Sequence, residues 1–189
     1  MVQKIKTALL ALAAFLFALG TPVAGLCALP AEPKKGAVKV EDGLYIGFLW
    51  PLRGSTSSAY GMGHDPISRD IVRHHSGLDI SAPVGTQVVA SRAGRVTFAG
   101  ALGGYGNLVI LSHADNMETR YSHLSSFKVK QGNFVRPGQV LGAVGNTGRS
   151  TGGHLHFEVR ESGRTVDPMK WLVPYGFMMP LRQYDSRPK

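Results

Sequence analysis

Short apolar runs separated by glycine-containing turns dominate the chain from residue 44 onward. Beyond the first 25 residues no stretch holds an apolar period of 3.6 residues, so the pattern predicts strands and not helices. The runs recur roughly every ten residues with turn residues between them, which is typical of an antiparallel sheet or sandwich. Predicted strands fall within residues 86–99 (two strands turned at Ala93-Gly94), 108–112, 118–123, 135–144 and 155–160.

The sequence therefore predicts an all-β fold class, a small antiparallel β-sheet or sandwich domain. One short helix is expected near the C-terminus, after Pro168 and through residues 169–172. The 24 glycines of the 189 residues fit this picture, because tight turns between short strands use glycine often.

The N-terminus has the layout of an export signal. Lys4 and Lys6 precede an apolar stretch over residues 8–19, and Val23-Ala24-Gly25 is an acceptable small-residue cleavage site. The apolar stretch is short for a transmembrane span, although an uncleaved N-terminal anchor stays open as an alternative. We expect a signal peptide over residues 1–25, and its removal would take the net charge from +9 to +9 − 2 = +7.

Composition divides the rest of the chain into three parts. Residues 26–43 are rich in Ala, Pro and Lys and are predicted to form a linker or N-terminal extension. Residues 44–173 form the predicted domain, and residues 174–189 a C-terminal tail. Cys27 is the only cysteine, so no disulfide can staple the domain. It follows an apolar leader, which suggests a lipid anchor, but Leu26 stands where lipoprotein signals usually carry Gly, Ala or Ser, and lipidation stays open.

The positive charge of the chain is scattered. It forms no basic helix and no stripe interleaved with aromatic residues, which argues against a nucleic-acid partner. A scattered excess of Lys and Arg fits adsorption to an anionic polymer.

Three histidine-bearing segments carry the candidate chemistry: His75-Ser76-Gly77-Leu78-Asp79, Tyr121-Ser122-His123-Leu124 and His154-Leu155-His156. A catalytic zinc needs three protein ligands and one open position for water. On an extended strand alternate side chains share a face, so His75 would lie beside Asp79, and His154 beside His156. The set offers three ligands and leaves two imidazoles for acid–base work.

The order of the motifs resembles the LytM/lysostaphin-type zinc endopeptidases, which cut the peptide cross-links of peptidoglycan. The resemblance spans roughly residues 50–168. It is carried by the histidine segments and by Ala82-Pro83-Val84-Gly85-Thr86-Gln87-Val88, Gly104-Tyr105-Gly106-Asn107, Val135-Arg136-Pro137-Gly138-Gln139 and Gly145-Asn146-Thr147-Gly148-Arg149-Ser150-Thr151-Gly152-Gly153-His154-Leu155-His156-Phe157-Glu158.

This resemblance implies a role for each site residue. His75, Asp79 and His156 would ligate Zn2+, and His123 and His154 would be the catalytic imidazoles. It also implies a lysostaphin-like domain, a duplicated hybrid motif with a long substrate groove, and peptidoglycan peptide stems as the partner. We expect an exported monomer of the periplasm or cell envelope, touching the membrane only through its leader or a lipid anchor. The alternative is a non-catalytic LytM-like regulator that activates another cell-wall hydrolase.

Several points stay open at this stage. The resemblance does not decide between a D-Ala to diamino-acid cross-link and a glycine bridge, although a short exported chain favours the first. Gly63 stands where members of the family often carry an arginine, which could change the electrostatics of the groove. Latency imposed by the N-terminal segment is equally open. Strand alternation places Glu158 on the histidine side, either behind a ligand or in solvent, and solvent is favoured. His64, His74 and His113 are expected to have no catalytic role.

Overall fold

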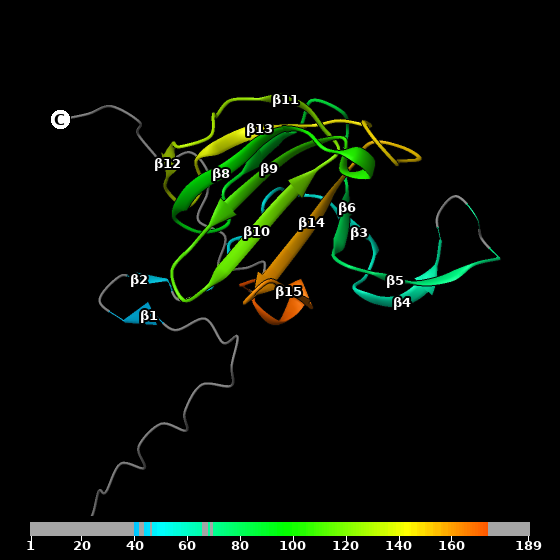
Figure 1. Cartoon of the computed structure of the whole chain (residues 1–189), viewed down its shortest axis with the longest axis horizontal. Coiled ribbons are helices and arrows are strands. Elements are labelled where there is room, and N and C mark those ends of the chain that lie inside the picture. The colour runs from blue at the N-terminus through cyan, green and yellow to red at the C-terminus, as the bar shows by residue number, and fades with distance from the viewer. Residues whose placement is uncertain (1–39, 42–43, 46, 66–67, 69, 174–189) are drawn as a thin grey trace, which may run out of the picture. The chain divides into compact units, whose positions relative to one another are not determined.

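A large antiparallel sheet forms the body of the protein in the computed structural model, which describes residues 40–41, 44–45, 47–65, 68 and 70–173. All of them lie in the compact unit Pro33–Lys189. The sheet order is β12-β8-β9-β10-β14-β6-β3, with β15 paired to β14 (Figure 1). Its strands are β3 Ser55–Ser58, β6 Leu78–Ser81, β8 Gly94–Ala101, β9 Asn107–Ser112, β10 Met117–Ser122, β12 Phe134–Val135, β14 His154–Glu161 and β15 Arg164–Val166.

A second, three-stranded sheet packs against the first. Its order is β11-β13-β7, from Leu124–Phe127, Val140–Val144 and Gln87–Val89. Separate two-stranded sheets are β4 Gly61–His64 with β5 Val72–His75, and β1 Val40–Glu41 with β2 Leu44–Tyr45. The helical segments within the described residues are two 3-10 turns, η1 Gly103–Tyr105 and η2 Pro168–Lys170.

The hydrophobic core lies between the large sheet and the three-stranded sheet. Alternate residues of each strand point into it, as Leu155, Phe157 and Val159 do from β14. Leu141 and Val144 meet them from β13. The core therefore holds β14 by one face and leaves its other face, which carries the histidines, to build a site.

The all-β prediction is confirmed, and each strand region expected from alternation contains strands. The expected short helix is a single 3-10 turn, in which Asp167 accepts a hydrogen bond from the Met169 amide. One local prediction is wrong: residues 75–79 are not one extended strand. β5 ends at His75 and β6 begins at Leu78, and the two strands belong to different sheets.

The predicted signal peptide, Cys27, most of the linker and the tail lie outside the described residues. Within the described part of the chain, no helix is long and apolar enough to cross a membrane.

Candidate active site

Strand register brings the histidine segments together. β14 lies between β6 and β10, and His156 is the direct cross-strand partner of Asp79 on one side and of Ser122 on the other. Opposed residues on neighbouring strands have Cβ atoms about 5 Å apart, so Asp79 and His156 meet although they are far apart in sequence. His123 follows Ser122 at the end of β10, and His154 lies two residues before His156 on the same face.

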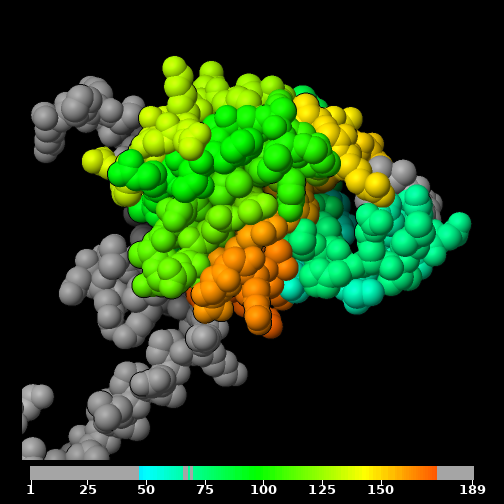
Figure 2. Space-filling view, viewed as in Figure 1, coloured from blue at the N-terminus to red at the C-terminus, as the bar shows by residue number. Residues whose placement is uncertain are grey.

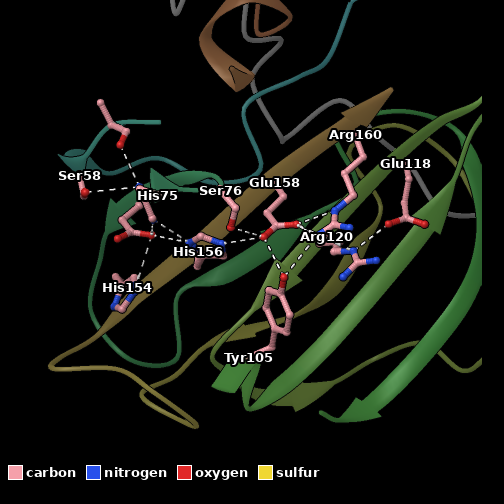
Figure 3. A network of polar contacts seen from close by, with 12 residues as sticks. Ser58, His75, Ser76, Tyr105, Glu118, Arg120, His154, His156, Glu158 and Arg160 are labelled. Carbon is pink, nitrogen blue, oxygen red and sulfur yellow. Dashed lines mark hydrogen bonds and ion pairs between the residues drawn. The ribbon is translucent and has the colours of Figure 1, made fainter. Parts of the chain in front are cut away.

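Three ligand-type atoms converge at this point. His75 Nε2 lies 3.1 Å from Asp79 Oδ1 and 3.1 Å from His156 Nδ1, and His156 Nδ1 lies 2.8 Å from Asp79 Oδ1. Atoms that bind a tetrahedral zinc at 2.0–2.1 Å lie roughly 3.3 Å from one another. The three predicted ligands are therefore arranged as one face of such a tetrahedron. Figure 3 shows two of them, His75 and His156, side by side.

The contacts on the outer side of the His75 and His156 rings determine which ring nitrogen carries the proton. His75 Nδ1 lies 2.8 Å from the Ala59 carbonyl, and His156 Nε2 lies 3.2 Å from Glu158 Oε1. Carbonyl and carboxylate oxygens only accept here, so each of these nitrogens carries a proton. In the neutral rings the inner nitrogens, His75 Nε2 and His156 Nδ1, then carry lone pairs. These two nitrogens face each other and Asp79 Oδ1. Such a set of acceptors fits a bound cation, and neutral imidazole with carboxylate suits zinc.

The electrostatics of the cluster favour positive charge. Burial would raise the pKa of Asp79, but the hydrogen bonds and charges of His156 and His75 outweigh it and hold that pKa well below its usual range. Burial would lower the pKa of His156, but Asp79 and Glu158 outweigh it and raise that pKa to about 9. A zinc ion would bind there in competition with this proton.

Glu158 is buried, and the expectation that it lies in solvent is wrong. Its side chain is 0% exposed and accepts hydrogen bonds from Ser76 Oγ at 2.6 Å, Tyr105 Oη at 3.0 Å and Arg160 Nε at 2.8 Å (Figure 3). Burial would raise the pKa of Glu158, but bonds from His156, Ser76 and Arg160 lower it to about 2. A carboxylate behind a metal-binding histidine fixes its tautomer and orientation. Alternation placed Glu158 on the histidine face, which was the signal for this role.

The two predicted catalytic imidazoles lie beside the ligand cluster. The rings of His123 and His154 have centroids 4.8 Å apart, and His154 Nε2 lies 3.9 Å from Asp79 Oδ1. His123 Nδ1 donates to the Thr147 carbonyl at 2.7 Å, and His154 Nδ1 to the Gly152 carbonyl at 2.9 Å. In each neutral ring Nε2 is left as an acceptor, the atom that a general base uses.

His123 is held in an unusual backbone conformation. Its φ is 60°, in the left-handed region that non-glycine residues adopt rarely, and its amide donates to the Tyr105 carbonyl at 2.9 Å. Such strain tends to persist where the surroundings fix a functional side chain. Burial lowers the pKa of His123 to about 4, which keeps the imidazole neutral near pH 7.

All five predicted site residues line one groove of about 610 Å³. One wall is the β4–β5 hairpin and the other is the segment over residues 149–153, which leads into β14. Figure 2 shows the hairpin (green-cyan, right) beside this segment (yellow). The groove is large enough for an extended peptide segment.

Gly77 leaves space for the ring of His156. A Cβ atom at this position would lie 2.5 Å from the Phe157 carbonyl oxygen and 2.9 Å from His156 Cε1. Any larger residue would therefore displace the His156 ring. At Gly63 a Cβ would meet nothing within 4 Å, and Gly63 is the direct cross-strand partner of Arg73. A guanidinium is thus present on this hairpin although residue 63 has no side chain.

The other histidines have separate surroundings. His74 packs edge-on against Tyr60, with ring centroids 4.8 Å apart. His113 is buried outside the groove and contacts the Ala93 carbonyl at 2.8 Å and Thr119 Oγ1 at 2.7 Å. His64 lines the groove wall, away from the three ligand atoms.

Comparison with known proteins identifies the family. Residues 73–168 match Peptidase family M23. The DD-carboxypeptidase/endopeptidase Mpg of Neisseria meningitidis is 51% identical over 141 residues, 75% of this chain and 30% of the relative. The murein hydrolase activator NlpD of Escherichia coli is 35% identical over 124 residues, 65% of this chain and 30% of the relative. The chain thus spans about 30% of the length of these relatives.

Solved structures agree with this match. A zinc-containing peptidase from Vibrio cholerae has a TM-score of 0.60 at 32% identity, covering 69% of this chain and 44% of that one. The catalytic domain of the antimicrobial peptidase lysostaphin from Staphylococcus simulans has a TM-score of 0.56 at 34% identity, covering 61% and 90%.

Proposed function

This chain belongs to peptidase family M23, and from that membership we propose that it is a zinc-dependent endopeptidase that hydrolyses peptide cross-links of peptidoglycan. One observation carries the proposal. His75, Asp79 and His156 present three acceptor atoms to one point, while the Ala59 carbonyl and Glu158 accept hydrogen bonds from the outer ring nitrogens. A resident zinc fits this donor set.

The residues of the chain divide the work of hydrolysis. A bound zinc would lower the pKa of a coordinated water to about 7 and polarise a carbonyl. His123, neutral because burial lowers its pKa to about 4, accepts a proton at Nε2. His154 holds its Nε2 toward Asp79, beside the ligand cluster, where it can accept or donate a proton during attack and departure. The groove walls align the peptide and limit its access to water.

The relative named DD-carboxypeptidase/endopeptidase supports a D-Ala to diamino-acid cross-link as the bond that is cut. The proposal includes export to the periplasm or cell envelope through residues 1–25, and a catalytic domain over residues 44–173. The chain carries its complete ligand set, which favours catalysis over the activator role named for NlpD.

The test is mass spectrometry of muropeptides after purified cross-linked peptidoglycan is incubated with the protein, with and without a zinc chelator. Chelator-sensitive conversion of cross-linked dimers to monomers is the expected result, and the product masses name the bond. A zinc-loaded protein that leaves the dimers intact would contradict the proposal. If that protein increased hydrolysis by a second wall hydrolase, it would be an activator.

A further inference from the structure

Two arginines on opposite walls of the groove share one buried carboxylate. Arg73 belongs to β5 of the hairpin, and Arg149 to the segment that leads into β14. Arg149 Nη2 donates to Oδ1 and Oδ2 of Asp65 at 2.8 and 2.7 Å, and Arg73 Nε lies 3.1 Å from Oδ2. The Asp65 side chain is only 1% exposed. It therefore fixes both guanidinium groups in place and ties the two walls together.

Both guanidinium groups remain open to the groove. The side chain of Arg73 is 54% exposed and that of Arg149 is 46% exposed. A guanidinium has five N–H donors. Within the described part of the chain, the ion pairs with Asp65 use Nη2 of Arg149 and Nε of Arg73. The other nitrogens of each group are left to bind a ligand.

The charge of this cluster suits an anion. Two arginines and one aspartate leave a net charge of +1 at the groove wall. The other acidic side chain among the described residues of the lining is Asp79, which belongs to the metal-ligand cluster. Planar guanidinium groups match the geometry of a carboxylate and bind it through paired hydrogen bonds. Because both arginines are already held by Asp65, little side-chain entropy is lost on binding.

We propose that Arg73 and Arg149 bind a carboxylate of the peptide stem, so that the protein selects stems whose carboxylates are free over stems whose carboxylates are amidated. This inference rests on the proposed function, since it assigns the substrate chemistry that the same groove recognises. Each arginine is a specificity residue. The competing explanation is a structural clip, in which Asp65 and Arg149 only hold the hairpin to the body.

The experiment compares two matched substrates, cross-linked muropeptide dimers whose stem carboxylates are either free or amidated. We expect the zinc-loaded protein to cut the free form with a kcat/KM roughly 10- to 100-fold higher, mainly through KM. Arg149→Gln and Arg73→Gln should each lower kcat/KM for the free form about tenfold more than for the amidated form, so that the preference shrinks. Arg164→Gln removes an exposed arginine outside the groove lining and should keep the full preference.

A second measurement separates this inference from the proposed function. Calorimetry records binding of uncross-linked stem tetrapeptides, free and amidated, to the same zinc-loaded variants. Tighter binding of the free tetrapeptide, together with no cleavage of the cross-linked dimers, would keep the inference and reject the hydrolase. Equal cleavage and equal binding of both forms would reject the inference and keep the hydrolase. Equal losses of kcat/KM on both substrates in Arg149→Gln would show that the cluster is only a structural clip. That result would also overturn the inference.

Discussion

The two halves of the site each hold a buried histidine, and their surroundings shift the pKa values of His156 and His123 in opposite directions. His156 is 7% exposed and His123 is 6% exposed, so burial does not distinguish them. Burial lowers both pKa values, but Asp79 and Glu158 raise that of His156 to about 9, whereas the pKa of His123 falls to about 4 beside a carbonyl. The difference between these histidines is the charge of their hydrogen-bond partners.

This contrast supports the proposed division of the site into metal ligands and acid–base residues. The half built from His75, Asp79 and His156 gathers a carboxylate and two imidazoles whose ligand atoms lie close enough together to hold one cation. In the half built from His123 and His154, backbone carbonyls orient the two rings. Variants that exchange or remove these partners should therefore affect zinc binding in one half and turnover in the other.

The largest effect is expected from the ligand half. His156→Ala removes one of three ligand atoms and should abolish both zinc binding and cleavage, a loss of at least about 10³-fold in kcat/KM. Zinc content by inductively coupled plasma mass spectrometry, together with the muropeptide assay, measures both. The control is His113→Ala, which removes a buried histidine outside the groove and should keep its zinc. Normal zinc content and normal cleavage in His156→Ala would remove the basis of the assignment.

The acid–base half should lose turnover alone. His123→Ala and His154→Ala leave all three ligand atoms in place, so each should bind one zinc per chain and lose roughly 10²- to 10⁴-fold in kcat. Zinc content and kcat are measured on the same preparation. A zinc loss as complete as that of His156→Ala would show that the two halves are not separate.

The pH dependence of folding gives the next largest effect. Burial lowers the pKa of His113 to about 4. Between pH 6.5 and 4 the unfolded chain then binds a proton that the folded one does not, so stability falls as pH falls. The loss is about 3 kcal/mol for this group between pH 7 and 4. Carboxylates with lowered pKa values, such as Glu158 at about 2, lose their contribution at lower pH.

Urea unfolding of the chelated protein at pH 7, 5.5 and 4 measures this slope. His113→Gln changes a residue outside the groove lining and should flatten this slope. The part that belongs to His123 stays, and the raised pKa of His156 acts in the opposite direction. An unchanged slope in His113→Gln would mean that the buried imidazole is not the source of the pH dependence of stability.

The smallest effect is expected from the outer partner of His156. Glu158→Gln keeps the shape of the side chain but removes the charge that orients the ring, and should weaken zinc binding by roughly 10- to 100-fold. Competition with a calibrated zinc chelator measures the change. Glu118→Gln is the matched control, because it pairs with Arg120 in the same sheet without contacting a ligand. Equal affinities in the two variants would argue against a role for Glu158.

The sequence predicts the large sheet well and the hairpin poorly, for a physical reason. Strands such as β6 alternate between buried and partly exposed residues, and this period is visible in the sequence. β4 and β5 form a two-stranded sheet with no fully buried face, so no alternation marks them. Because this region lacks the pattern, the break between His75 and Leu78 could not be predicted from the sequence.

The sequence also predicts the residues of the candidate site better than it predicts the contacts around them. His154 and His156 share a face because of the strand period, and the order of the motifs supplies the other members. The burial of Glu158 could not be predicted, since Ser76 and Tyr105 reach it from two other segments, beside Arg160 of its own strand. The link from Asp65 to Arg149 likewise joins residues whose contact depends on the tertiary fold.

The most direct test of the account is an anomalous difference map at the zinc absorption edge from crystals of the protein grown with zinc. We expect one peak at the convergence of His75 Nε2, His156 Nδ1 and the Asp79 carboxylate, with His123 and His154 beside it and not bound. No peak there, or a peak that includes His154 in place of His156, would contradict it.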